Sequence, residues 1–262
     1  KMKALVKNEL RQTKGMLAIW LSLELMLIAF AYFEYLSLEG SLEELTHAAA
    51  LFPDFLKIMF GVGDNIASPI GWYSCIYYWT GLLAFPYAAY LGSSCMTKEL
   101  KQGTSEYLFT KPVCRRDIVL SKVIAGIFNM LVFSAFCGVC NYFMSILPLG
   151  ELGQTDVPFS TTAGMFLTQS TLFALSFAVS GITRTYKSAT RYSTLLFLLF
   201  YVLYMIAAYT KIGMLRFLTP LQFFEVGSVI SDGLQIPFLL LSIAIITISI
   251  LIGNRAWKTK EL

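Results

Sequence analysis

Six apolar runs of about 20 residues each limit what this sequence can fold into more than any other feature. A helix needs about 20 consecutive apolar residues to cross the hydrocarbon core of a bilayer. Apolar residues make up 56% of the chain and charged residues 14%, a balance outside the range of soluble domains. We therefore predict an all-α polytopic membrane protein of one domain, residues 1–262, with spans at about 16–36, 72–95, 119–146, 160–182, 191–210 and 236–253.

Lys and Arg residues are concentrated on one side of the predicted spans. Seventeen of the twenty lie in the N-terminal segment, in 96–122, in 183–191 or after 253. Because basic segments are retained in the cytoplasm, this pattern predicts that both termini are cytoplasmic. The same pattern accounts for the net charge of +4, so nucleic acid is not expected as a partner.

The N-terminal segment has the pattern of an amphipathic helix. Apolar residues from Met2 to Leu10 fall on one helical face, and basic residues from Lys3 to Arg11 fall on another. Such a helix lies flat on a membrane surface. We therefore predict an elbow helix over residues 1–14, followed by the first span.

A long polar segment, residues 96–122, separates the second predicted span from the third. Apolar residues recur at helical spacing from Met96 to Tyr107, which predicts an amphipathic helix over 97–111. Pro112 ends this helix, because proline has no amide hydrogen and disfavours a helical conformation of the residue before it. A further helix then enters the membrane.

This segment resembles the first cytoplasmic loop of ABC-2 type permeases, the membrane subunits of bacterial ABC exporters with the type V, ABCG-like fold. The matching residues are Glu99, Gly103-Thr104, Glu106, Thr110-Lys111-Pro112-Val113, Arg115-Arg116 and Ile118. The resemblance implies that the 97–111 helix is a coupling helix that contacts a separate ATP-binding subunit. The contact residues that it implies are Glu99, Lys101, Gly103, Thr104, Glu106, Arg115 and Arg116.

The resemblance also implies an assembly of two permease copies and two ATP-binding subunits in the plasma membrane of a bacterium. The sequence has no G-x-x-x-x-G-K-[ST] pattern for ATP phosphates, no HExxH and no nucleophile elbow. We therefore expect no enzyme activity and no cofactor in this chain, with ATP and Mg²⁺ bound by the partner subunit. Cys137 and Cys140 form a CxxC within an apolar span, where we interpret them as small apolar side chains rather than metal ligands.

Aromatic residues are frequent in the second predicted span and recur at helical spacing in the fifth. The resemblance implies that these spans line a pathway between two permease halves, and the candidate pathway residues are Tyr77, Phe85, Tyr201 and Tyr204. The alternative is ordinary packing in the core or against lipid. Glu24, the one acid well inside a span, is a further candidate for binding substrate or a proton, or else a carboxyl that only orients helices.

Together these features predict the permease of an ATP-driven exporter for an amphipathic or hydrophobic substrate. A peptide, such as an antimicrobial peptide or a phenol-soluble modulin, is the preferred substrate, and a drug or a lipid is the second choice. Export rather than import follows from the resemblance alone. The alternatives are an ion-coupled secondary transporter and a non-transporting membrane scaffold, neither of which has a use for a helix that docks on an ATPase.

Overall fold

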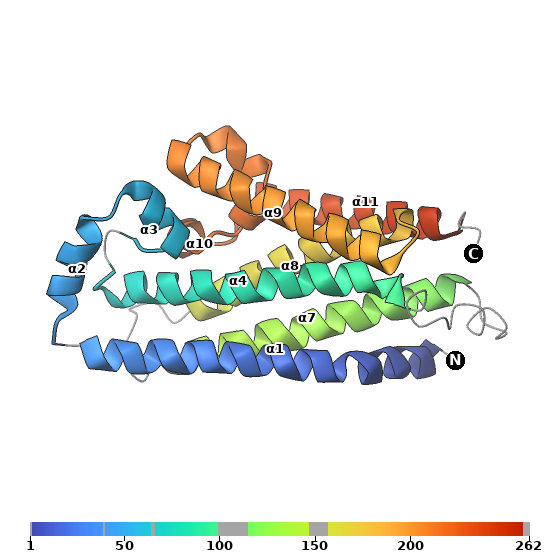
Figure 1. Ribbon diagram of the computed structural model, residues 1–262, viewed down its shortest axis with the longest axis horizontal. Coiled ribbons are helices and arrows are strands. Elements are labelled where there is room, and N and C mark those ends of the chain that lie inside the picture. The colour runs from blue at the N-terminus through green and yellow to red at the C-terminus, as the bar shows by residue number, and fades with distance from the viewer. Residues whose placement is uncertain (1, 39, 64–65, 99–114, 147–156, 259–262) are drawn as a thin grey trace.

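The computed structural model describes residues 2–38, 40–63, 66–98, 115–146 and 157–258, and every regular element in these ranges is helical (Figure 1). This confirms the predicted all-α class. The long helices are α1 (Met2–Leu38), α4 (Pro69–Cys95), α7 (Arg115–Ile146), α8 (Val157–Ile182), α9 (Tyr186–Thr210) and α11 (Ile236–Lys258). The short elements are α2 (Leu42–Ala50), α3 (Asp54–Phe60), α10 (Val226–Asp232) and the 3₁₀ turns η1 (Gly213–Phe217) and η2 (Pro220–Gln222).

Each predicted span lies within one of the six long helices. Five of them, α1, α7, α8, α9 and α11, have both the length and the sustained hydropathy needed to cross a membrane. Helix α4 is long enough at 27 residues, but its Tyr, Trp, Gly and Ser residues lower its hydropathy, and many of its side chains are buried in the bundle. The chain is thus a multi-pass membrane protein, and the sixth span stays a prediction.

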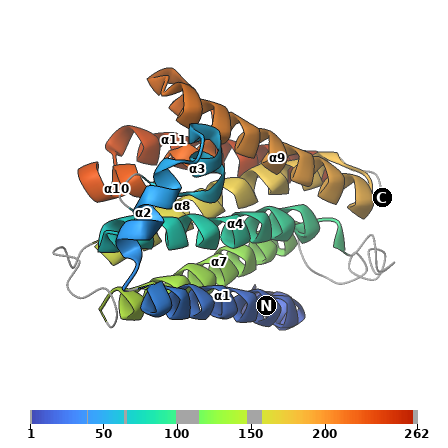
Figure 2. The ribbon, with the colours of Figure 1, turned by 60° about the vertical axis from the view of Figure 1, so that its left-hand side comes forward.

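The two ends of the bundle differ in the elements that they carry. The start of α1, the end of α11, the end of α4, the start of α7 and the α8–α9 turn lie at one end (Figure 1). We call this the basic end, because the basic clusters of the sequence fall there. The short helices α2, α3 and α10 lie at the opposite end (Figures 1 and 2).

Helix α8 is the centre of the bundle and packs against α4, α7, α9 and α11. Glycines allow the closest of these approaches. A side chain at Gly92 of α4 would collide with the backbone carbonyl oxygen of Phe173 in α8, and a Cβ at Gly181 would lie 2.7 Å from the carbonyl oxygen of Gly253 in α11. Small residues at such crossings let helix backbones meet, which is how helices associate in a bilayer.

Helix α1 corrects one expectation. A separate elbow helix over 1–14 is not seen, because α1 runs without a break from Met2 to Leu38. A lone glycine at position 15 costs a helix only about 1 kcal/mol, and polar contacts hold this half of α1 along α7. Glu9 forms an ion pair with Lys122 at 3.2 Å, and Asn129 donates a hydrogen bond to the Thr13 hydroxyl at 3.1 Å.

Replacing Gly92 by Ala should destabilise the fold, because the backbone of α8 cannot move aside as a side chain can. Overpacking of this kind costs about 1–3 kcal/mol. The matched control is Gly15→Ala in α1, where no atom lies within 4 Å of an added Cβ. Thermal unfolding of the detergent-solubilised protein should show a lower midpoint for Gly92→Ala only, and equal midpoints for the two variants would contradict the close packing.

Candidate functional site

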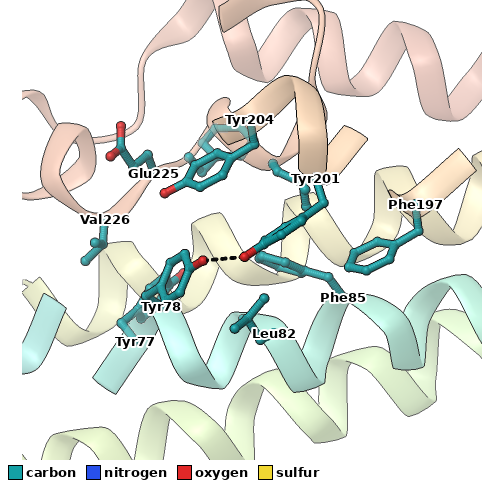
Figure 3. Close-up of a pocket in the computed structure, with 12 residues that line it drawn as sticks. Tyr77, Tyr78, Leu82, Phe85, Phe197, Tyr201, Tyr204, Glu225 and Val226 are labelled. Carbon is teal, nitrogen blue, oxygen red and sulfur yellow. Dashed lines mark hydrogen bonds between the residues drawn. The ribbon is translucent and has the colours of Figure 1, made fainter. Parts of the chain in front are cut away.

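Aromatic side chains at matching intervals face each other from α4 and α9 (Figure 3). Residues at positions i, i+4 and i+7 of each helix lie on one helical face, and here they are Tyr78, Leu82 and Phe85 on α4, and Phe197, Tyr201 and Tyr204 on α9. The two helices run in opposite directions (Figure 1). Tyr78 therefore lies toward Tyr201 and Tyr204, whereas Phe85 lies toward Phe197 (Figure 3).

A hydrogen bond joins the two helices across this gap. The hydroxyls of Tyr78 and Tyr201 are 2.8 Å apart, and the Tyr78 hydroxyl also donates to the carbonyl oxygen of Met59 in α3 at 3.0 Å. The Tyr204 ring stacks on both neighbours, with centroid distances of 6.3 Å to Tyr78 and 6.4 Å to Tyr201. The three tyrosines form one connected unit, which we call the tyrosine cluster.

The aromatic faces enclose a cavity of about 50 Å³, which we call the aromatic pocket. Residues from the segment before α10, among them Leu221, Phe224 and Glu225, complete its lining. Most of its surface is therefore apolar and aromatic, and hydroxyl groups are the main polar groups that it offers. Such a surface suits a hydrophobic or amphipathic ligand rather than a strongly hydrophilic one.

Glu225 is the one charged residue among the described residues that line the aromatic pocket. Burial raises the pKa of its carboxyl above the ordinary value, whereas the Arg216 guanidinium and the Ser228 hydroxyl act in the opposite direction. Arg216 is itself held by a hydrogen bond to Ser228 at 2.8 Å and lies over the Phe238 ring at 5.2 Å. The pocket thus has a carboxyl group that is easier to neutralise than an exposed one.

The structure brings four of the five predicted pathway residues together: Tyr77, Phe85, Tyr201 and Tyr204 all line the aromatic pocket. Tyr77 differs from the others, because its hydroxyl donates to the Thr161 carbonyl oxygen of α8 and only 6% of the residue is exposed. Its polar end therefore anchors α4 on α8, and only its ring is available to the pocket.

Glu24 lies outside the aromatic pocket. It is fully buried in α1 and faces Thr80 of α4, with Cys137 of α7 nearby. Within the part of the chain that the structure describes, the Glu24 carboxylate and the Thr80 hydroxyl have no side-chain partner other than each other. A role of Glu24 in binding a proton or a substrate stays a prediction.

The predicted coupling helix over 97–111 falls mostly outside the described residues. Five of its predicted contact residues lie there: Glu99, Lys101, Gly103, Thr104 and Glu106. The other two, Arg115 and Arg116, form the first turn of α7 at the basic end, where Arg116 is exposed. Two turns further along α7, Lys122 makes its ion pair with Glu9, so the start of α7 is tied to α1.

Tyr78 and Glu225 are among the pocket residues that sequence reasoning did not select. A signal existed for Tyr78, because it precedes Leu82 by four residues and Phe85 by seven, the spacing of a helical face. No such signal existed for Glu225. Its position depends on how residues 211–235 fold back onto α4 and α9, which spacing within one helix does not reveal.

The family model for ABC-2 family transporter proteins matches residues 3–262. The match includes every element that builds the aromatic pocket, so the pocket belongs to the family domain itself. No curated protein matches the sequence.

The hydrogen bonds of the tyrosine cluster predict that Tyr78→Phe and Tyr201→Phe lower the free energy of unfolding by unequal and non-additive amounts. Tyr201→Phe removes one hydrogen bond, whereas Tyr78→Phe removes that bond and the one to Met59. At about 0.5–1.5 kcal/mol for each bond, Tyr78→Phe should lower the free energy of unfolding more, and the double variant should match Tyr78→Phe alone. Denaturation in detergent measures these differences, with Tyr209→Phe on the exposed face of α9 as the control. Additive losses in the double variant would show that the two hydroxyls do not share a bond.

Proposed function

Because the chain belongs to the ABC-2 family of transporter proteins, and so is a membrane-spanning subunit of an ABC transporter, we propose that it exports an amphipathic or hydrophobic substrate. An amphipathic peptide is the preferred substrate, and a hydrophobic drug or a lipid is the second choice. The proposal places the basic end in the cytoplasm of a bacterium, with both termini there, and the α2, α3 and α10 end outside.

The aromatic pocket is the observation that supports this substrate class. Its rings offer apolar contacts without a fixed pattern of hydrogen-bond donors, which suits amphipathic molecules that differ in sequence. Its volume of about 50 Å³ is well below the roughly 300–1,000 Å³ of ordinary ligand sites. A peptide therefore fits only if α4 and α9 separate, or if a second copy of the chain contributes the rest of the pathway.

Opening of the pocket would require the tyrosine cluster to break. The Tyr78–Tyr201 hydrogen bond spans the gap between α4 and α9, and the stacked Tyr204 ring covers it. These contacts are weak enough, at about 1 kcal/mol each, to be reversed within a transport cycle. The energy for the change comes from ATP hydrolysis on a partner subunit, to which the 97–111 segment would couple the permease.

Removing a pocket ring should weaken the response to substrate. In the complex of the chain with its ATP-binding subunit, Tyr204→Ala should raise the concentration of an amphipathic helical peptide that half-stimulates ATP hydrolysis. An aromatic contact of about 0.5–1.5 kcal/mol corresponds to a shift of about two- to tenfold. The stimulation curves are measured in reconstituted bilayers.

Tyr209→Ala is the matched control for this prediction, because Tyr209 lies on the same helix but is 60% exposed. It should leave the stimulation curve of the parent protein in place. Identical curves for Tyr204→Ala, Tyr209→Ala and the parent would show that the rings of the aromatic pocket pack the helices together and do not bind substrate.

Reversing the charge at Glu106 should impair the partnership with the ATP-binding subunit. Breaking one side of a buried ion pair costs about 3–5 kcal/mol, whereas an exposed pair contributes about 1 kcal/mol or less. Glu106→Arg should therefore reduce copurification of the two subunits or uncouple ATP hydrolysis from transport, while insertion and folding of the permease are preserved.

The control for Glu106→Arg is Glu44→Arg, an equal charge change at an exposed position of α2 at the opposite end of the molecule. Glu9 would be a poor control, because it is paired with Lys122. Normal copurification and transport by Glu106→Arg would remove the coupling role from the 97–111 segment.

A further inference from the structure

A second and much larger cavity lies between α1 and α4, beneath the short helices α2 and α3. Its volume is about 540 Å³, within the roughly 300–1,000 Å³ typical of ligand sites. Helix α4 contributes Trp72, Cys75, Ile76 and Trp79 to it, residues on a different face from those of the aromatic pocket. We call it the lateral cavity, and nothing in the proposed function makes use of it.

The aromatic walls of the lateral cavity are held in place by specific contacts. The indole of Trp79 donates a hydrogen bond to the carbonyl oxygen of Phe60 in α3 at 3.1 Å, and the two rings lie 6.3 Å apart. At the other end, the Trp72 ring packs on Tyr35 of α1 with 5.5 Å between centroids. The two tryptophan walls of the cavity are therefore held by contacts with α3 and α1, whereas Phe30 and Phe52, which also line it, are exposed.

Charge is distributed unevenly along the lateral cavity. Glu34 is the only charged side chain among the described residues that line it, and the rest of the lining is almost entirely apolar. Along α1 the lining runs from Leu27 to Leu38, a distance of about 16 Å at 1.5 Å per residue. Glu34 lies in the half of this stretch nearer to α2, so the carboxylate is close to one end of the otherwise apolar cavity.

We propose that the lateral cavity binds an amphiphile with a single alkyl chain and a cationic amine headgroup. The chain would lie along Leu27, Ala31 and Trp79, and the headgroup would lie at Glu34. A carboxylate attracts a cation and repels an anionic headgroup. The proposal concerns binding alone, so it stands or fails separately from the export of a peptide.

Quenching of tryptophan fluorescence tests this site directly. The protein is placed in phosphatidylglycerol nanodiscs, whose lipid carries no cationic headgroup, and is titrated with dodecylamine that carries bromine on its terminal carbon. Bromine quenches tryptophan on contact, so bound probe should quench Trp79 in a saturable manner. The saturable part should be absent in Trp79→Phe and in Ala31→Phe, which fills the chamber.

Glu34→Gln tests whether the Glu34 carboxylate binds the amine headgroup. Residue 34 is exposed, so this substitution should leave the fold intact. In this variant the half-saturating concentration of the bromoamine should rise by about two- to fivefold. The matching uncharged probe, dodecanol with bromine on its terminal carbon, should bind the variant and the parent equally. Glu44→Gln, an exposed position on α2 outside the cavity lining, should change neither value. Quenching without saturation in the parent, or equal bromoamine binding by the parent and Glu34→Gln, would overturn the proposal.

A second arm distinguishes a lipid occupant from a free amphiphile. If lysophosphatidylethanolamine, which has one acyl chain and an amine headgroup, is added to the nanodiscs and competes for the same site, it should raise the bromoamine concentration required. An equal amount of uncharged monoacylglycerol, which dilutes the anionic lipid to the same extent, should not raise it by as much, and that difference identifies an aminolipid as an occupant of the site. Unchanged binding in these discs assigns the site to free cationic amphiphiles instead.

Discussion

Helix α8 can lie in contact with both α4 and α11 only because glycines occupy the crossings. Lipid chains are as apolar as the side chains of a membrane helix, so helices in a bilayer gain little from burying apolar surface and depend on close packing instead. Gly92 and the Gly181–Gly253 pair provide that packing. The two helices that pack on α8 in this way differ in their side chains. Helix α11 is largely apolar, whereas α4 supplies aromatic residues to both cavities.

The aromatic pocket and the lateral cavity share more than α4. The C-terminal end of α3 lies against both, since Met59 accepts a hydrogen bond from Tyr78 of the pocket and Phe60 accepts one from Trp79 of the cavity. Gly61 ends α3 with φ of 67° and lies so close to the Tyr78 ring that a side chain would not fit. A structural change at either site would therefore alter the contacts of the same short helix, α3.

Much of the fold could be predicted from the sequence, because bilayer length and hydropathy are properties of a continuous segment. The aromatic residues of the second and fifth predicted spans, together with the resemblance to ABC-2 permeases, likewise identified Tyr77, Phe85, Tyr201 and Tyr204, which line one pocket. What the sequence could not reveal depends on contacts between distant segments. The pairing of Glu9 with Lys122, which holds α1 against α7, joins residues more than 100 positions apart in the chain. The placement of Glu225 depends on a segment that folds back onto α4 and α9.

The unbroken α1 has a mechanical consequence. At 37 residues it is about 55 Å long. Near its N-terminal end, the ion pair between Glu9 and Lys122 joins it to α7, two turns from Arg115 at the start of α7. A rotation imposed on the first turn of α7 would tilt α1 as a lever, and the displacement would grow with distance from the ion pair. The far arm of that lever is the stretch from Leu27 to Leu38, which forms one wall of the lateral cavity. A rotation at the basic end would therefore change the width of a cavity at the opposite end of the bundle.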